Sequence, residues 1–267
     1  MVREPAVAGS FYTGGASALA VEVDAFLAGA GPARAQALGI VAPHAGYVYS
    51  GAVAGAVFGR VDVPARVIVL GPNHTGLGRA RAALYPEGAW RTPLGEVPVD
   101  PGLTRALAAA PGVRPDPLAH LREHALEVQI PFLQRARPEG LSIAALCLAH
   151  LSYDECEALG GAVADAALAA GALVVASSDM SHYIPAEAAR AADGRAIERI
   201  LALDPEGLYD VVHAEEISMC GIIPATVMLV AARARGATRA ELVRYANSGD
   251  VTGDHRHVVG YAGILVA

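Results

Sequence analysis

The chain has 267 residues, of which 54% are hydrophobic but only 5% aromatic, and its formal net charge is −7. This length suffices to bury a substantial core, which must be built mainly from Ala, Val, Leu and Ile. The basic residues are scattered along the chain without a cluster, so we do not expect nucleic acid as a partner.

Cysteine content and hydropathy indicate the compartment. The three cysteines, Cys147, Cys156 and Cys220, cannot all pair, which is typical of a reducing environment. The first fifteen residues lack the apolar core of a signal peptide, and no later apolar run has the length of a membrane span. We therefore expect a soluble, cytoplasmic protein that does not interact with membranes.

Short apolar runs alternate with helix-like stretches over the first two thirds of the chain. Buried strands are predicted at Gly39–Ala42, Arg66–Leu70, Ser142–Leu148 and Ala172–Ala176. Helices are predicted between them at Ser50–Phe58, which follows a Ser that can cap, and at Glu123–Arg135 and Tyr153–Ala170. This alternation predicts an α/β fold in which helices pack on a sheet.

The remaining segments complete one compact unit. The segment Arg79–Asp100 is rich in Pro and Gly and is predicted to be a hairpin or loop excursion from the sheet. Because we find no repeat, low-complexity tract or linker, we predict a single domain over residues 1–267. Downstream of Ser177 we predict three helices and then two strands that flank a polar loop: Ala186–Leu203, Pro205–Val212, Ile222–Ala232, Glu241–Ala246 and Val258–Val266.

Polar side chains follow three of the predicted strands at the point where each strand ends. His44 follows GIVA and Pro43, His74 follows RVIVL in GPNH, and Asp179 and His182 follow ALVVA in SSDMSH. The carboxyl ends of strands in an α/β fold meet in one crevice, so these side chains gather if the strands are neighbours. One such histidine alone is better explained as a hydrogen-bonded turn residue. Their repetition instead favours a metal site, since imidazole binds Fe, Cu, Zn or Ni.

Two further groups leave alternatives open. Cys220, in SMCG before a predicted helix, is either a thiolate favoured by the helix dipole or a small packing residue, whereas Cys147 and Cys156 are predicted to be inert core residues. Glu123 and Glu127, four residues apart, are either acceptors that orient metal-binding imidazoles or a charged first turn. The neighbouring histidines His255 and His257 are predicted to lie in a solvated loop.

Eight motifs in order resemble the Memo protein family over essentially the whole chain: AVAGSFYTGG, APHAGYVYSG, LGPNH, RTPLGEVPVD, EHALEVQIPF, SSDMSH, MCG and YANSGD. The family is similar in fold to LigB-type, class III extradiol dioxygenases. The resemblance thus implies a mixed central sheet with helices on both faces and a mononuclear iron site.

Carried over by position, the resemblance implies that His44, His74 and Cys220 are metal ligands. Asp179 and His182 match pocket residues of the family, and His182 is similar to the acid/base histidine of the dioxygenases. We expect Asp179 to fix the tautomer of His182. The dioxygenases have Glu where this chain has Cys220, and a thiolate is a softer ligand, so copper and zinc are alternatives to Fe(II).

Three functions remain open. The first is a non-haem iron oxidoreductase of unknown substrate, the second a non-catalytic module that binds a small molecule or peptide in the same pocket, and the third a redox or copper-binding protein that uses Cys220. Bacterial and archaeal members of the family also imply an AMMECR-type protein and a radical SAM protein as partners.

Overall fold

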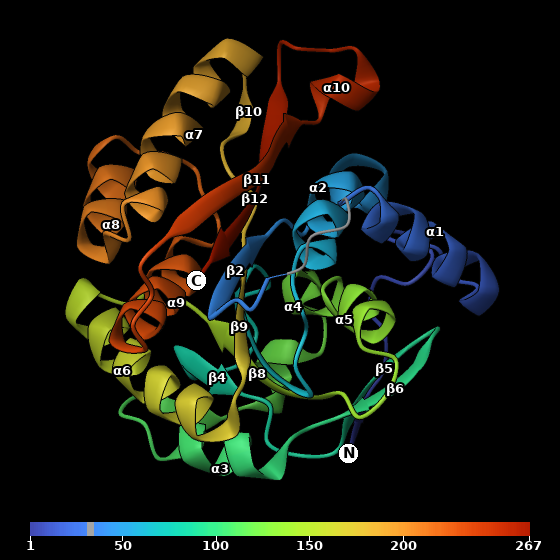
Figure 1. Ribbon diagram of the computed structural model, residues 1–267, viewed down its shortest axis with the longest axis vertical. Coiled ribbons are helices and arrows are strands. Elements are labelled where there is room, and N and C mark those ends of the chain that lie inside the picture. The colour runs from blue at the N-terminus through green and yellow to red at the C-terminus, as the bar shows by residue number, and fades with distance from the viewer. Residues whose placement is uncertain (31–34) are drawn as a thin grey trace.

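A computed structural model describes residues 1–30 and 35–267 of the chain. Its centre is a nine-stranded mixed sheet with helices on both faces (Figure 1). The strand order is β10-β12-β2-β9-β3-β8-β4-β7, and β11 pairs with β12. The predicted α/β fold is therefore confirmed. The strands are β1 (Val2–Arg3), β2 (Gly39–Ala42), β3 (Arg66–Pro72), β4 (Ala82–Leu84), β5 (Ala89–Thr92), β6 (Gly95–Pro98), β7 (Val113–Pro115), β8 (Ser142–Leu148), β9 (Leu173–Ser177), β10 (His182–Ile184), β11 (Ala240–Asn247) and β12 (Val258–Val266).

Helices flank this sheet in two layers. Helices α1, α2 and α5 pack together on one face, and α6, α9, α3, α7 and α8 lie on the other (Figure 1). Alternate residues of β3 point into two separate cores: Ile68 and Leu70 into one, Val67 and Val69 into the other. A strand covered on both faces must be apolar throughout, which is why RVIVL reads as a continuous apolar run. The helices are α1 (Ala16–Ala28), α2 (Tyr47–Gly59), α3 (Pro101–Ala108), η1 (a 3₁₀ helix, Pro117–His120), α4 (His124–Glu127), α5 (Ile130–Ala136), α6 (Tyr153–Ala170), α7 (Ala186–Leu201), α8 (Pro205–Ala214), α9 (Ile222–Ala234) and α10 (Gly249–Thr252).

Two predicted segments differ from the structure. The segment Arg79–Asp100 is not wholly an excursion, because its strand β4 joins the central sheet antiparallel to β8. Only β5 and β6 form the predicted hairpin, which pairs with β1 in a second, three-stranded sheet. The predicted helix Glu123–Arg135 is divided into α4 and α5 at Val128 and Gln129, and Pro131 lies in the first turn of α5.

Two smaller differences concern where helices begin and where a loop was predicted. Helix α2 begins at Tyr47, and Ser50 lies inside it, where its hydroxyl donates to the Ala45 carbonyl instead of capping the helix. The polar loop between the last two strands contains the short helix α10.

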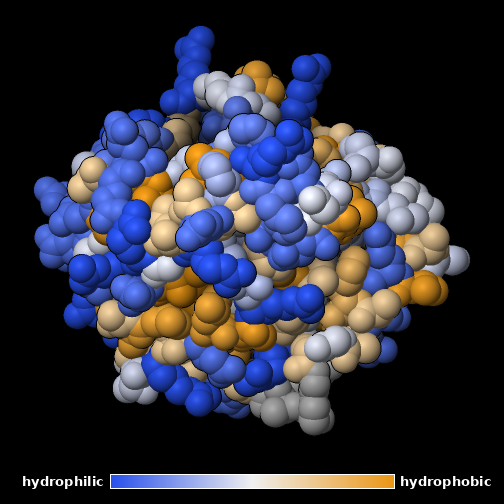
Figure 2. Space-filling view, turned by 90° about the horizontal axis from the view of Figure 1, so that it is seen from above, coloured by the Kyte–Doolittle hydropathy of each residue, from blue (hydrophilic) through white to orange (hydrophobic). Residues whose placement is uncertain are grey.

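The helices and the surface were compared with what a membrane protein requires. Within the described residues, no helix combines the length and apolar character needed to cross a membrane. Figure 2 shows hydrophilic and hydrophobic residues side by side on the face seen from above Figure 1.

Candidate metal centre

Three adjacent strands bring the predicted site residues together. Strands β2, β9 and β3 are parallel neighbours, and Ala42 of β2 pairs with Ser177 of β9. His44 and Asp179 each lie two residues beyond this pair. The shared register therefore places the Asp179 carboxylate 2.7 Å from the backbone N–H of His44. The condition on which the sequence argument depended, that these strands are neighbours, is met.

Three imidazoles converge at this edge of the sheet. One nitrogen each of His44, His74 and His124 lies within 4.8 Å of the others, close enough to share a metal ion. The rings of His74 and His124 are stacked with centroids 4.7 Å apart, and His44 meets both edge-on. Such a set of neutral imidazoles suits a first-row transition metal.

The hydrogen bonds of Ser177 fix the tautomer of His44. The Ser177 hydroxyl donates to the Ala125 carbonyl at 2.6 Å and accepts from the Gln129 amide at 2.8 Å. Its one proton is thus used, so Nδ1 of His44, 2.9 Å away, must be the donor in that contact. Nε2 of His44 then carries a lone pair. Burial lowers the pKa of His44 well below its usual value, which keeps the ring neutral and able to ligate.

Glu123 orients His74. Its carboxylate accepts from the His74 backbone N–H at 2.6 Å and from His74 Nδ1 at 2.9 Å. Burial would raise the pKa of Glu123, but the bonds from His74 and Ala125 outweigh it and lower the pKa. Of the two alternatives that the sequence left open for Glu123, the structure shows the orienting contact, together with an N-cap bond to Ala125.

Glu127 has a different role from Glu123. It forms a fully buried ion pair with Arg3 and accepts from the hydroxyl of Tyr12 and the backbone N–H groups of Ala6 and Val7. Glu127 therefore anchors the N-terminal segment, and its hydrogen bonds are to that segment instead of to the imidazoles.

Cys220 reaches the site through a close backbone approach. Its Sγ lies 3.1 Å from Nε2 of His44 and accepts from the Asp179 backbone N–H at 3.3 Å. A Cβ on Gly221 would lie 2.3 Å from the Ser177 carbonyl oxygen, so glycine is required there for Cys220 to approach the strand ends. Of the two alternatives that the sequence left open for Cys220, the metal-free structure does not favour the thiolate: burial, aided by Asp179, raises the pKa of Cys220. A bound metal would reverse this by stabilising the thiolate.

Asp179 and His182 lie in the same pocket but are held by different groups. The Asp179 carboxylate accepts from the backbone of His44 and Ala45, and burial raises its pKa to about 6. The hydrogen bond that fixes the His182 tautomer is made by Nδ1 to the Ser218 carbonyl at 2.9 Å, instead of to Asp179 as the sequence predicted. This bond leaves Nε2 of His182 able to exchange a proton.

His124 is the residue that sequence reasoning missed as a site residue. It begins α4, and Phe11 packs against its ring with centroids 4.7 Å apart. The available signal was its place beside Glu123 in EHALE, but α4 follows no strand, so the rule of strand ends could not find it.

A cavity of ≈790 Å³ lies over these residues, and we call it the carboxyl-end pocket. Aromatic side chains of Phe11, Tyr49 and Tyr261 form part of its wall. Tyr183 lies at the rim with φ of 59°, a left-handed conformation that is uncommon for a non-glycine residue and concentrates at functional sites. His257 also lines the pocket, although it is exposed as predicted.

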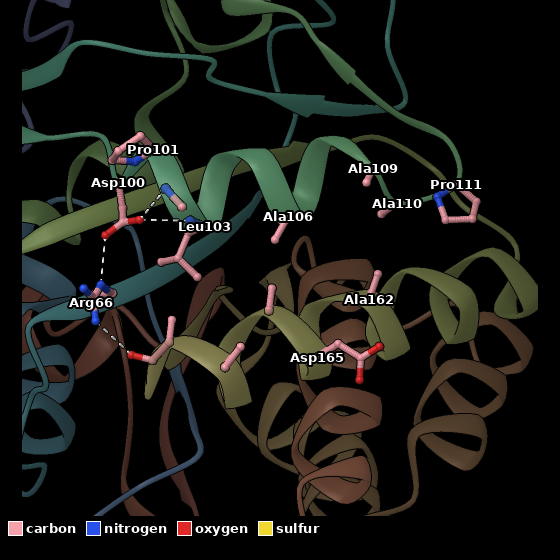
Figure 3. Close-up of a pocket in the computed structure, with 14 residues that line it drawn as sticks. Arg66, Asp100, Pro101, Leu103, Ala106, Ala109, Ala110, Pro111, Ala162 and Asp165 are labelled. Atoms are coloured by element: carbon pink, nitrogen blue, oxygen red, sulfur yellow. Dashed lines mark hydrogen bonds and ion pairs between the residues drawn. The ribbon is translucent and has the colours of Figure 1, made fainter.

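A second cavity of ≈830 Å³ lies between α3 and α6 at the other end of β3, and we call it the α3–α6 cavity (Figure 3). Its walls are mostly Ala, with Leu103 and two prolines, and its polar groups are the ion pair of Arg66 with Asp100 and the carboxylate of Asp165. This lining gives no converging set of ligands, unlike that of the carboxyl-end pocket.

Comparison with known proteins identifies the family of the chain. A sequence profile described as Memo-like protein matches residues 3–265. A MEMO1 family protein of Aquifex aeolicus is 41% identical over 99% of this chain and 98% of its own length. The MEMO1 family protein of Methanopyrus kandleri is 42% identical over 99% of this chain and 99% of its own length. That of Methanothermobacter thermautotrophicus is 40% identical over 98% of this chain and 99% of its own length. The chain belongs to the Memo family.

Proposed function

We propose that the carboxyl-end pocket binds one transition-metal ion through His44, His74 and Cys220 and performs metal-dependent oxidoreductase chemistry on a small molecule. The observation that supports this most is the convergence of three imidazoles, one of them beside the Cys220 thiol, at the wall of a cavity large enough for a ligand. Fe(II) is the metal that the family resemblance implies, and a donor set of imidazole and thiolate also suits copper and zinc.

The chain's own residues would divide the chemistry as follows. The metal, when bound, would supply a Lewis acid and a redox centre. His44 and His74 present neutral nitrogens because Ser177 and Glu123 accept their Nδ1 protons. His182 would exchange a proton with the substrate through Nε2, since its Nδ1 is bound to Ser218. Asp179 would hold the His44 backbone and place a carboxylate at the pocket wall.

Metal binding is tested by elemental analysis of protein purified without oxygen, beside the variants His44→Ala and Cys220→Ser. We expect the wild-type protein to retain close to one metal ion per chain and both variants to lose it, because each removes a donor at the same centre. His150→Gln, an exposed histidine paired with His213, is the matched control. Full metal occupancy in both site variants would refute the proposal.

Turnover is tested separately. Iron-loaded protein and His182→Ala would be given a panel of catechols under air, with oxygen uptake as the readout. We expect uptake by the wild-type protein and its loss in His182→Ala. A metal-replete protein that consumes no oxygen and changes no catechol would refute ring cleavage and favour a binding module in the same pocket.

The AMMECR-type and radical SAM proteins implied by the resemblance belong to this proposal as partners. Their recovery with the tagged protein from a native host, compared with a tagged control, is the measurement that checks them.

A further inference from the structure

The carboxylate of Glu123 contacts two of the three imidazoles. Its Oε1 lies 2.9 Å from Nδ1 of His74 and 3.3 Å from Nδ1 of His124. Its Oε2 accepts from the His74 backbone N–H, and Oε1 also accepts from the Ala125 backbone N–H. One side chain therefore lies behind both stacked rings.

The surroundings hold this carboxylate in place. Glu123 has no solvent exposure, and its backbone carbonyl accepts from the Arg3 guanidinium at 2.7 Å. The same guanidinium pairs with Glu127 and donates to the His120 carbonyl at 3.0 Å. The segment that carries Glu123 and His124 is thus fixed by a buried charge from the N-terminal strand, and Phe11 closes the outer face of the His124 ring.

We propose that Glu123 is the positioning residue of the metal centre, which sets the Nδ1–H tautomer of both His74 and His124 and directs their Nε2 atoms to the metal. Both oxygens of Glu123 already accept backbone N–H groups, so an imidazole nitrogen that faces them is favoured as a donor. Carboxylates in this position fix the ring and raise the basicity of a ligating histidine. The inference rests on the proposed metal binding and adds His124 to the residues that the centre uses.

A purely structural role for Glu123 is the alternative, because its bond to Ala125 caps α4. The two roles separate in Glu123→Gln. Ala125 and both imidazoles share Oε1, so a glutamine whose oxygen stays on the His74 backbone N–H turns its NH₂ group, which cannot accept, toward the rings and Ala125. The variant thus retains the volume while it removes the charge, the cap bond and the acceptor that the two rings share, and the ring tautomers report the loss of that acceptor.

The first test uses metal-free protein, in which long-range ¹H–¹⁵N NMR of labelled histidines reports the tautomer of each ring. We expect Nδ1–H for both His74 and His124 in the wild-type protein and a shift of both toward Nε2–H in Glu123→Gln. His44, whose Nδ1 is bound to Ser177, should stay unchanged in both. An Nε2–H tautomer at either ring in the wild-type protein, or unchanged tautomers in Glu123→Gln, would overturn the inference.

The second test is Co(II) binding, followed by competition with a chromophoric chelator. We expect Glu123→Gln to weaken binding by about 10- to 100-fold. Glu127→Gln is the matched control: it alters the same segment and the Arg3 pair, and should lower stability while leaving the tautomers unchanged. Tautomers that change equally in Glu127→Gln would assign the effect to folding and overturn the inference. Wild-type protein that binds no Co(II) refutes the proposed function, whereas tight wild-type binding that Glu123→Gln retains refutes only the role of Glu123.

Discussion

The two ends of the central sheet carry cavities of similar size, ≈790 Å³ at the carboxyl-end pocket and ≈830 Å³ at the α3–α6 cavity. They differ in how their polar groups are held. At the carboxyl-end pocket, hydrogen bonds to Ser177, Glu123 and Ser218 each determine the orientation of a histidine. At the α3–α6 cavity Arg66 and Asp165 are exposed, the buried Asp100 caps α3 and pairs with Arg66, and most of the wall is alanine (Figure 3). Convergent and oriented side chains, instead of volume, identify the functional site.

The ion pairs at the two ends give the sharpest contrast. Arg3 and Glu127 both have side chains with no exposure, whereas the Arg66 side chain at the α3–α6 cavity is 52% exposed. Arg3→Met leaves the Glu127 carboxylate buried without its partner, so we expect a loss of about 3–5 kcal/mol in the free energy of unfolding. Arg66→Met should cost about 1 kcal/mol or less, because exposed pairs contribute little. Urea denaturation of both variants measures this. Equal losses of unfolding free energy in the two variants would show that the buried Arg3–Glu127 pair stabilises the fold no more than the exposed pair does.

Strand positions and the residues that follow them could be predicted from the sequence because both depend on local patterns. The bounds of β2, β8 and α6 agree with the prediction. The ligand candidates His44 and His74 were found because they directly follow apolar strands. Arg3 and His124 could not be found in this way: Arg3 contacts Glu127 across more than a hundred residues, and His124 lies on a short helix that follows no strand and that this buried pair helps to hold in place.

The partner of His182 and the pKa of Cys220 could not be predicted for a related reason. Both depend on which groups surround the side chain after folding. Nδ1 of His182 is bound to the Ser218 carbonyl, 36 residues away, and burial beside Asp179 raises the pKa of Cys220. Short-range sequence patterns carry no information on either.

Two glycines, one at the candidate metal centre and one on the surface of α6, provide a second contrast. A Cβ on Gly221 would overlap the Ser177 carbonyl, whereas a Cβ on Gly161, in α6, would meet nothing within 4 Å. We expect Gly221→Ala to cost about 1–3 kcal/mol through overpacking. It should also displace Cys220, which would weaken the sulfur-to-cobalt charge-transfer band of Co(II)-loaded protein. Gly161→Ala should instead stabilise the fold by about 0.5–1 kcal/mol, since alanine is the better helix former. An unchanged band in Gly221→Ala would argue against Cys220 as a ligand.

The smallest effect is expected at the α3–α6 cavity itself. Asp165 is its carboxylate on α6 and is exposed. Asp165→Asn removes a charge from the surface without breaking a buried contact, so the free energy of unfolding should stay within about 0.5 kcal/mol of the wild-type value. Co(II) affinity should not change, because the site lies at the other end of β3. Asp179→Asn is the matched variant at the carboxyl-end pocket. It should lower stability or Co(II) affinity, because the Asp179 carboxylate accepts from the His44 backbone. A larger loss of Co(II) binding in Asp165→Asn than in Asp179→Asn would reverse the assignment of the two ends.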